Sequence, residues 1–506
     1  MNKDYILSLD SGTTSCRTLV VDKKGKIVSM SQAEFTQFFP NSGWVEHDAL
    51  EIWNTQLGTM QSAKSKANIR TDQISAIGIT NQRETVVVWD KETGLPVYNA
   101  IVWQDRRTSE YCDQLIEKGY SDMITDKTGL LINPYFSGTK IRWILKNVPE
   151  AQHKLEQKKL LAGTIDCWLI WKLTNGKVHA TDVTNASRTM LFNINTLQWD
   201  EDILKLLEIP KEILPQVKSS SEHYGYVDPK LLSQRATYEV PITGVAGDQQ
   251  SALFGQLCTE VGMVKNTYGT GCFTLINIGT KPIKSKNKLL TTIAWKIGNE
   301  PTIYALEGSV FIAGSAIKWL RDSIKVIYNA AECDFYCELA EKDPQNVFIV
   351  PSFTGLGAPY WDSYSRGAIL GLERGTKREH IVKATVESIA FQSYDLLKAM
   401  EKDLQKDIKV LKVDGGASNS NYLMQFQSSI SNLRVERPAV TETTALGAAY
   451  LAGLASKFWN SLEEIKKINE IDKVFEPKFT QEQINKKIKG WNESVKRTLN
   501  WTKAIE

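Results

Sequence analysis

The sequence has few of the residues that build metal centres or disulfide frameworks. Its 506 residues include only seven cysteines and five histidines, and no CxxC pair occurs. An odd and scattered set of cysteines favours reduced, mostly buried thiols over disulfides or a zinc site. The histidines are equally dispersed, so neither a His-based metal site nor a Ser-His-Asp triad is indicated. The cysteines are Cys16, Cys112, Cys167, Cys258, Cys272, Cys333 and Cys337, and the histidines are His47, His153, His179, His223 and His380.

Long apolar runs and an excess of one charge are also missing. The N-terminal stretch MNKDYILSLD is charged by its fourth residue, and its apolar run is far shorter than a secretory signal or a membrane span requires. The formal net charge is only +3, with basic and acidic residues interspersed, which argues against nucleic acid as the main partner. We therefore expect a cytoplasmic protein that has no stable membrane insertion and binds no nucleic acid.

The signatures of several common nucleotide-binding folds are absent from the sequence. There is no GxxxxGKS or GxxxxGKT loop, which excludes a P-loop enzyme, and the HRD and DFG motifs of protein kinases are missing. The GTG at residues 269–271 does not fit a Rossmann fingerprint. A chain of 506 residues is too long for one ordinary core, so two large domains are expected.

Polar residues and glycines concentrate in the stretch from Gly244 to Phe273, GVAGDQQSALFGQLCTEVGMVKNTYGTGCF. Asp248 follows an apolar, glycine-broken run, as a carboxylate does when it is held at the C-terminal end of a strand. Gly269 and Gly271 allow a tight bend through which main-chain N–H groups can approach a phosphate. The pattern predicts that Asp248 is a general base and that Thr270 lies beside a transferred phosphoryl group.

The N-terminal residues predict a β-hairpin with a polar tip. Tyr5 to Leu9 alternate as a strand does, residues 10–15 (DSGTTS) make a sharp turn, and the chain returns as a strand from Arg17 to Asp22. Such a tip offers N–H groups and hydroxyls to phosphate oxygens, and Asp10 is placed to hold a hydrated Mg²⁺. An ordinary β-turn capped by Ser and Thr explains the same residues.

Arg83 and Glu84 stand between two strongly apolar segments, residues 74–79 and 86–89. Two adjacent charges in such a place indicate either a solvated bend or a site that holds a hydroxylated small molecule. Trp103 and Tyr135 lie beside polar residues in segments with turn chemistry, where they serve either the core or a site. Amphipathic helices are expected at residues 48–60, 311–321 and 382–400.

The second half of the chain is expected to begin near Pro241 and to repeat the first. An apolar strand leads to Asp248 in the second half as another leads to Asp10 in the first, so both residues are expected to head related segments. A later strand ends in the glycine pair Gly415-Gly416, which admits a phosphate or a flat ligand at a helix N-terminus. These features predict an α/β fold of two similar domains with the site between them.

Strings from end to end of the chain, DSGTTS, GWVEHD, ITNQRET, IVWQDRRT, INPYFSGTK, AGDQQSALFGQ, KNTYGTGCF, FTGLGAPYWD, VDGGAS and TALGAAYLAG, resemble the FGGY family of carbohydrate kinases. Several of them are specific to the branch of that family that phosphorylates glycerol. The resemblance implies an α/β fold of two ribonuclease-H-like (actin-like) domains related by duplication, with a cleft between them. It places a glycerol pocket and a phosphate loop in residues 1–250 and nucleotide binding in residues 251–506.

The resemblance also implies an activity and its residues. The activity is ATP-dependent phosphorylation of glycerol to sn-glycerol 3-phosphate with release of ADP, in which Asp248 is the catalytic base. ATP and Mg²⁺ would be required, with Asp10 directed toward the Mg²⁺ through water. The implied glycerol-binding residues are Arg83, Glu84, Trp103, Tyr135, Asp248, Gln249 and Phe273. The implied nucleotide-binding residues are Thr13, Thr14, Ser15, Arg17, Thr270, Gly314, Lys318, Gly416 and Ser420.

The sequence departs from the family pattern in a few places. Residue 11 is Ser where Gln is common, and Lys318 and Ser420 replace the Gln and Asn that bacterial members often place near the nucleoside. Residues 223–241 lack the glycine-rich loop that goes with inhibition by fructose 1,6-bisphosphate, so we expect that allosteric site to be absent or weak. The resemblance further suggests a homodimer or homotetramer. Alternatives are an FGGY kinase acting on a pentulose or a longer polyol, and a catalytically silent nucleotide-binding regulator.

Overall fold

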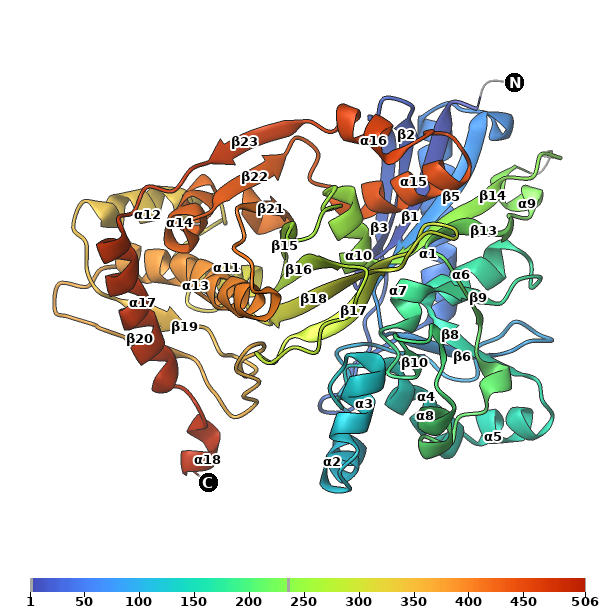
Figure 1. Ribbon diagram of the computed structural model, residues 1–506, viewed down its shortest axis with the longest axis horizontal. Coiled ribbons are helices and arrows are strands. Elements are labelled where there is room, and N and C mark those ends of the chain that lie inside the picture. The colour runs from blue at the N-terminus through green and yellow to red at the C-terminus, as the bar shows by residue number, and fades with distance from the viewer. Residues whose placement is uncertain (1–2, 234–236, 506) are drawn as a thin grey trace.

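The computed structural model describes residues 3–233 and 237–505. Within these ranges, two large mixed sheets lie in separate lobes, with helices on their faces (Figure 1). Residues 234–236 fall inside the segment in which we expected no allosteric loop, so part of that prediction lies outside the described residues.

The first sheet contains the predicted N-terminal hairpin at its centre. Its order is β13–β14–β5–β1–β2–β3, in which β1 pairs antiparallel with β2 and parallel with β5, and β5 pairs parallel with β14. The strands are β1 (Tyr5–Ser11), β2 (Ser15–Asp22), β3 (Ile27–Glu34), β5 (Ile74–Asn81), β13 (Ser221–Tyr226) and β14 (Pro241–Gly247). The hairpin and the strand after residue 74 are therefore confirmed.

The second sheet repeats this arrangement. Its order is β17–β18–β16–β15–β21–β22–β23, and β15 pairs antiparallel with β16 and parallel with β21, as β1 does with β2 and β5. The strands are β15 (Val264–Tyr268), β16 (Cys272–Gly279), β17 (Leu290–Trp295), β18 (Ile303–Val310), β21 (Val410–Asp414), β22 (Arg434–Pro438) and β23 (Ile471–Phe475). The expected α/β fold of two duplicated domains is confirmed.

The place where the second half begins was predicted wrongly. The strand at Pro241, β14, belongs to the first sheet as the parallel neighbour of β5, and the counterpart of β1 in the second sheet is β15. Asp10 lies near the end of β1 and Asp248 directly follows β14, so the two residues belong to different strands of one sheet and are not equivalent by duplication. The error arose because an apolar run that ends in an acidic residue has the same pattern at any position in a sheet, and the pattern carries no information on strand pairing.

A smaller sheet, β4–β7–β6–β8, extends the first lobe downward (Figure 1). Its strands are β4 (Glu46–His47), β6 (Val86–Asp90), β7 (Ala100–Ile101) and β8 (Leu160–Thr164). The helices in this part of the chain are α2 (Ser109–Glu117), α3 (Ser121–Thr128), α4 (Ser137–Asn147), α5 (Pro149–Glu156), α6 (Ile165–Leu173), α7 (Val183–Ala186) and α8 (Glu201–Leu206). Helix α9 (Pro229–Leu232) lies beside the first sheet instead, where it contacts α1 (Ala49–Lys66) (Figure 1). Short pairs are made by β9 (Ala180–Asp182) with β12 (Gln216–Lys218) and by β10 (Phe192–Asn193) with β11 (Gln198–Trp199).

The predicted helices form, with shifted ends. Helix α1 (Ala49–Lys66) begins after Asp48, whose carboxylate accepts a hydrogen bond from the amide of Leu50 and so caps the helix. Helix α11 (Gly314–Asp322) covers most of residues 311–321, and α13 (Arg378–Leu404) extends the predicted 382–400 at both ends. The remaining elements are α12 (Glu332–Glu341), α14 (Asn421–Ser431), α16 (Leu462–Ile468), α17 (Gln481–Lys496), α18 (Trp501–Ile505), β19 (Phe348–Val350), β20 (Ala368–Leu370), and the 3-10 turns η1 (Thr71–Gln73), η2 (Lys211–Ile213) and η3 (Gly416–Asn419).

Helices α10 (Asp248–Gly255) and α15 (Thr443–Ala455) join the two lobes. Helix α15 comes from the second half of the chain but packs on β1, β5 and β14 of the first sheet, where it is seen as a red helix among blue and green strands (Figure 1). It also crosses α10 so closely that a Cβ atom on Gly447 would lie 1.8 Å from the carbonyl oxygen of Ser251. Only glycine permits this approach.

All seven cysteines lie within the described ranges, and each is buried and free. The expectation of reduced, buried thiols is thus confirmed. None of the helices in the described part of the chain combines the length and apolar character that a membrane span requires.

Candidate active site

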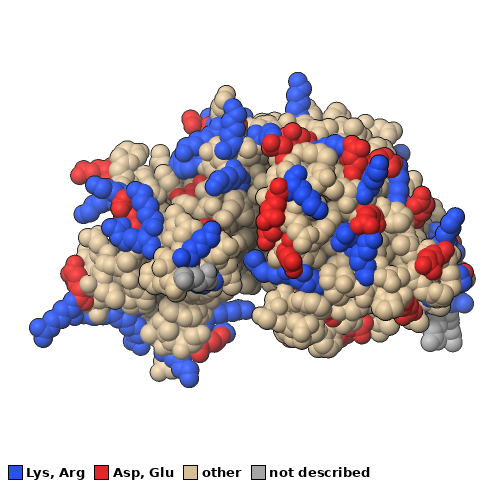
Figure 2. Space-filling view, turned by 90° about the horizontal axis from the view of Figure 1, so that it is seen from below, with Lys and Arg blue, Asp and Glu red and all other residues tan. Residues whose placement is uncertain are grey.

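The site residues gather where three parallel strands of the first sheet end. Asp10 is near the end of β1, Arg83 is two residues beyond β5, and Asp248 directly follows β14. Because these strands are parallel neighbours, with Ser11 opposite Asn81 and Asn81 opposite Gly247, their carboxyl ends meet at one edge. Such an edge is where open α/β sheets bind ligands. Viewed from below, the surface is hollowed between the two lobes (Figure 2).

Asp248 is the first residue of α10 and keeps part of its carboxylate accessible. Oδ1 accepts a hydrogen bond of 2.7 Å from the amide of Gln249 and lies 3.1 Å from Nε of Arg83. Oδ2 accepts no hydrogen bond from any described residue, and the side chain is 28% exposed. One oxygen is therefore held in place while the other faces the space between the lobes.

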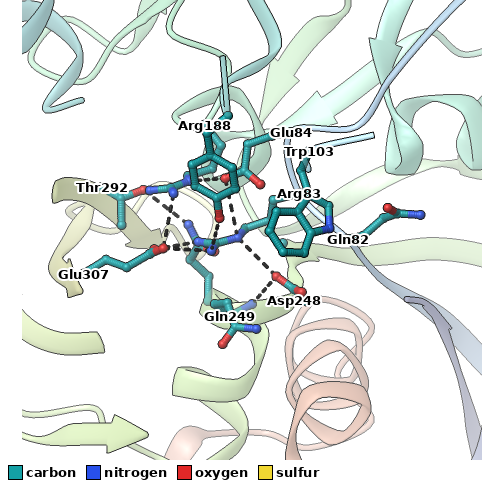
Figure 3. Close-up of polar contacts among 12 residues, drawn as sticks. Gln82, Arg83, Glu84, Trp103, Arg188, Asp248, Gln249, Thr292 and Glu307 are labelled. Atoms are coloured by element: carbon teal, nitrogen blue, oxygen red, sulfur yellow. Dashed lines mark hydrogen bonds and ion pairs between the residues drawn. The ribbon is translucent and has the colours of Figure 1, made fainter. Parts of the chain in front are cut away.

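Arg83 and Glu84 belong to a buried charge quartet with Arg188 and Glu307 (Figure 3). The two terminal nitrogens of Arg83 donate to the two carboxylate oxygens of Glu307, at 2.6 and 2.8 Å. Arg188 donates to Glu84 at 2.6 Å and to Glu307 at 3.2 Å. All four side chains are at most 2% exposed, and the quartet has equal numbers of positive and negative charges.

The charges within the quartet set each other's ionisation. Burial disfavours the carboxylate of Glu307, but Arg188 and Arg83 outweigh burial and lower its pKa to about 2. For Glu84 burial is the larger effect and raises the pKa, although both arginines oppose it. Burial also disfavours the charged form of Arg83, but Glu307 and Glu84 hold its pKa well above the ordinary value.

The aromatic trio of Trp103, Tyr135 and Phe273 lies beside these charges. The Trp103 ring meets Tyr135 edge to face at a centroid distance of 5.7 Å and Phe273 at 6.4 Å. The three rings are only half-buried, and Phe273 comes from β16 of the second sheet whereas the other two come from the first lobe. They form an apolar wall made jointly by both lobes.

Gln249 is held by Lys265, a buried residue of β15. The Lys265 ammonium donates to Oε1 of Gln249 at 2.5 Å and to Oγ1 of Thr267 at 2.8 Å. Burial lowers the pKa of Lys265 to about 8, although Asp414 and Asp248 partly oppose that effect. Lys265 thus occupies the side-chain oxygen of Gln249, while the backbone amide of Gln249 donates to Asp248 (Figure 3).

The predicted phosphate loop forms the tip of the β1–β2 hairpin. Its turn is closed by a hydrogen bond of 3.0 Å from the amide of Gly12 to the carbonyl of Ser15. Thr13 accepts a hydrogen bond of 3.0 Å from the indole of Trp103, Thr14 is exposed, and Ser15 accepts from Gln32. Arg17 forms an ion pair with Glu442, which directly precedes α15. The phosphate loop is thus in contact with Trp103 of the aromatic trio. The guanidinium of Arg17 is already paired with the carboxylate of Glu442.

The predicted nucleotide residues of the second lobe form two adjacent groups. Thr270 accepts hydrogen bonds at its carbonyl from Ala313 and Ser315, and a Cβ on Gly314 would lie 2.6 Å from the carbonyl oxygen of Gly269. Lys318 is exposed one turn further along α11.

Gly416 and Ser420 make the second group, at either end of η3, which packs on β15. A Cβ on Gly416 would meet nothing within 4 Å, so the space beside it is open. The Ser420 hydroxyl caps α14 and donates to Asp334, so it is already engaged.

Several residues of the site were missed in the sequence. The charge quartet includes Glu307 and Arg188, and Gln249 is held by Lys265. From the sequence alone, no role was assigned to these three residues. A signal existed for Glu307, which is the single charge in the largely apolar strand β18 and therefore needs a buried partner. Lys265 gave no such signal, because β15 (VKNTY) also contains Asn266 and Thr267. Asp414 is a further residue that was missed: it ends β21, is 1% exposed, and its Oδ1 is buried without a partner.

The donor set around Asp10 suits a hydrated cation. Asp10 lies beside the hydroxyl-bearing loop, and burial raises the pKa of its carboxyl to about 6, opposed by Arg17 and reinforced by Asp248. In the described ranges no three His, Cys, Asp or Glu side chains converge as a direct metal site. A magnesium ion here would be held by Asp10 through water, together with phosphate oxygens of a nucleotide.

Two duplicated lobes, a hydroxyl-bearing loop at the edge of one sheet and a carboxylate facing the space between them define a two-lobed phosphotransferase of the actin-like kind. The chain belongs to the FGGY family of carbohydrate kinases: residues 5–255 match that family's N-terminal domain and residues 264–456 its C-terminal domain.

Similar proteins agree with this assignment over the full length of the chain. A glycerol kinase of Malacoplasma penetrans is 76% identical over 503 residues, which cover 99% of both chains. A glycerol kinase of Mycoplasmopsis pulmonis is 69% identical over 505 residues and covers 100% of this chain and 99% of its own. The crystal structure of Plasmodium falciparum glycerol kinase with ADP superposes with a TM-score of 0.92 at 41% identity, over 98% of this chain and 99% of that one.

Proposed function

We propose that this protein is an ATP-dependent kinase that phosphorylates glycerol to sn-glycerol 3-phosphate and releases ADP. The observation that carries the proposal is the placement of Asp248. Its carboxylate stands at the carboxyl edge of the first sheet, with one oxygen fixed by Gln249 and Arg83 and the other free, next to the aromatic trio. The full-length similarity to glycerol kinases supports the choice of glycerol.

Glycerol has three carbons and three hydroxyls, and the site offers partners for both. Trp103 and Phe273 would cover the carbon chain, while Arg83, Glu84, Tyr135, Asp248 and Gln249 would bind the hydroxyls. Glu84 suits this role because one of its oxygens is fixed by Arg188 and the other accepts no hydrogen bond from the described residues. Arg83 suits it because its contact with the Tyr135 hydroxyl is long, at 3.4 Å, and a substrate hydroxyl can replace it.

ATP would bind across the hollow from glycerol. Thr13, Thr14, Ser15 and Arg17 would face the phosphates from the first lobe, and Thr270, Gly314, Lys318, Gly416 and Ser420 would hold the nucleotide from the second. Ser420 would contribute mainly through its backbone, because its hydroxyl is bound to Asp334. Mg²⁺, held by Asp10 through water, supplies charge neutralisation to the phosphate oxygens when it is bound.

The chemical step uses Asp248 as a base that acts mainly by orientation. Oδ2 would accept the hydrogen of a terminal hydroxyl and direct its oxygen in line at the γ-phosphorus. In a loose transition state the proton leaves late, so most of the acceleration comes from positioning, which supplies about 7–11 kcal/mol in well-oriented systems. Closure of the lobes around both substrates would exclude water and limit ATP hydrolysis.

The same proposal covers location and assembly. The substrate and the nucleotide are metabolites of the cell interior, so we propose a cytoplasmic enzyme. We further propose that it forms a homodimer or homotetramer, for which size-exclusion chromatography with light scattering is the direct measurement.

An ADP-release assay tests the proposed function. Purified protein is given Mg-ATP with glycerol, dihydroxyacetone, xylulose, gluconate or no acceptor. We expect turnover on glycerol in the range of about 1–100 s⁻¹ and little release without acceptor. A preference for xylulose or gluconate would keep the mechanism but overturn the substrate assignment. If no acceptor stimulated the release of ADP, a catalytically silent nucleotide-binding regulator would become the favoured function.

Replacing the proposed base tests the mechanism. Asp248→Asn keeps the size of the side chain but removes the acceptor of the hydroxyl proton, so kcat should fall by about 10²–10⁴-fold. ATP affinity, measured by calorimetry, should stay within about threefold because the nucleotide contacts lie elsewhere. Residual turnover near that of the parent protein would refute the role of Asp248.

A further inference from the structure

Glu307 is the one member of the charge quartet that comes from the second lobe. It lies on β18, opposite Leu275 of β16 and Leu290 of β17, and its side chain has no solvent exposure. Arg83, Glu84 and Arg188 all come from the first lobe. The quartet is therefore a charged contact between the lobes at the inner end of the site (Figure 3).

Glu307 takes a larger share of the hydrogen bonds of Arg83 than any other residue. A guanidinium has five N–H groups. Two of those of Arg83 donate to Glu307, one donates to Gln250 at 3.1 Å, and one reaches Tyr135 at 3.4 Å. The paired geometry with Glu307 fixes the plane of the group, because two parallel bonds to a carboxylate leave it no rotation.

The orientation of the guanidinium determines which nitrogen of Arg83 lies next to Asp248, the proposed base. With its terminal nitrogens held by Glu307, Arg83 presents only Nε to Oδ1 of Asp248, at 3.1 Å. Without Glu307, the nearest carboxylate that can pair with both an Nη and Nε is that of Asp248. The guanidinium would then turn toward Asp248 and occupy the oxygen that the substrate hydroxyl needs.

We infer that Glu307 is a positioning residue for phosphoryl transfer to glycerol: from the second lobe it holds the Arg83 guanidinium in the orientation that binds glycerol and leaves Asp248 Oδ2 free. The inference rests on the proposed function. It adds that the glycerol pocket is complete only when the second lobe contributes this carboxylate, so that pocket geometry and the relative placement of the lobes are coupled.

The test compares three variants with the parent protein. Glu307→Gln keeps the shape but removes the charge and one acceptor. Arg188→Met with Glu307→Gln removes one charge of each sign, so the remaining Arg83 and Glu84 stay balanced. Asp90→Asn is the matched control, because Asp90 is also buried and ion-paired, with Lys154 at 2.5 Å, but lies at the far end of β6 from the quartet.

For Glu307→Gln we expect the KM for glycerol to rise by about 10- to 100-fold, the effect of losing one hydrogen bond to a charged group. We expect kcat to fall and the KM for ATP to stay within about threefold, since the nucleotide contacts do not include the quartet. The double variant should recover part of the thermal stability that Glu307→Gln loses, because it restores equal numbers of positive and negative charges at the site, while its KM for glycerol stays high. Asp90→Asn should lose stability without a change in either KM.

The outcomes separate the inference from the function on which it rests. If the parent protein does not phosphorylate glycerol, the proposed function fails and the inference fails with it. If the parent does so and folded Glu307→Gln or the double variant has the parent's KM for glycerol, the inference alone is overturned. Equal increases in the KM values for glycerol and ATP would also overturn it, since they would mark a general structural defect.

Discussion

At the scale of one residue, the buried Lys140 holds the backbone of the segment that carries Tyr135. The Lys140 side chain has no solvent exposure, and its ammonium donates to the carbonyl oxygens of Tyr135 and Phe136 at 2.5 and 3.1 Å. Burial lowers the pKa of Lys140 to about 7, although Glu84 and Asp105 oppose it. Because an unfolded lysine titrates near 10.4, the unfolded chain binds the extra proton between about pH 7 and 10.

This shift predicts a pH-dependent effect of Lys140→Met. The depressed pKa means that the cost of burying the charge is fully present below about pH 7 and is relieved as the pH rises toward 10. The free energy of unfolding of Lys140→Met, minus that of the parent, should therefore be largest at pH 6–7. It should decline by roughly 1–3 kcal/mol by pH 9, because only the parent gains stability as the buried lysine loses its charge. Urea unfolding at several pH values measures this difference.

The exposed Lys205 on α8 supplies the matched control. Lys205→Met should shift stability by the same small amount at every pH. A stability difference for Lys140→Met that does not change between pH 6 and 9 would contradict the prediction.

Individual site residues could be predicted where the sequence itself is anomalous. Arg83 and Glu84 stood out because two charges interrupt apolar segments, and the structure places them in the buried charge quartet with Asp248 nearby. Their partners Arg188 and Glu307 lie more than a hundred residues away in the chain. Which distant charge neutralises a buried one depends on the packing of the lobes, and no local pattern contains that information.

At the scale of elements, the crossing of α10 and α15 controls the position of the proposed base. Asp248 begins α10, and Gly447 of α15 lies against the Ser251 carbonyl one turn further along. Gly447→Ala would push the helices apart, since a Cβ would lie 1.8 Å from that oxygen. We expect a loss of about 1–3 kcal/mol in the free energy of unfolding and a fall in kcat, measured by denaturant titration and the ADP-release assay.

Gly58 in α1 provides the control for this substitution. It is exposed, and a Cβ there would meet nothing within 4 Å. Gly58→Ala should stabilise the protein by about 0.5–1 kcal/mol, the usual gain in a helix interior, and leave kcat unchanged. If Gly447→Ala were as benign as Gly58→Ala, the close crossing would not be what positions Asp248.

The existence of several elements was predictable from the sequence, and the pairing of the strands was not. The N-terminal hairpin, the strand after residue 74 and the helices at α1, α11 and α13 follow from apolar periodicity. The strand at Pro241 was recognised but assigned to the wrong sheet, because strand neighbours are chosen by tertiary packing. The division of the chain into residues 1–250 and 251–506 stays a prediction, as do the roles of the single site residues.

For the molecule as a whole, the buried cysteines give a measure of global integrity. Burial raises the pKa of Cys16, Cys112, Cys258, Cys272 and Cys333 to about 12, so few thiolates form at ordinary pH. We expect native protein to react with essentially no equivalent of a thiol reagent within minutes at pH 8, and denatured protein to react at all seven cysteines. Rapid reaction of even one thiol in the native protein would contradict the described packing.

The return of α15 to the first sheet also bears on how the protein is made. One apolar face of that sheet, which includes Leu19, Val21, Ala76 and Ala246, is covered by α15, whereas α1 and α6 serve the opposite face. The last strand of the sheet ends at Gly247, and α15 is complete only at Ala455, roughly two hundred residues later. At ribosomal rates of about 5–20 residues per second, the nascent chain leaves that face bare for about 10–40 s, long enough for chaperones to bind it.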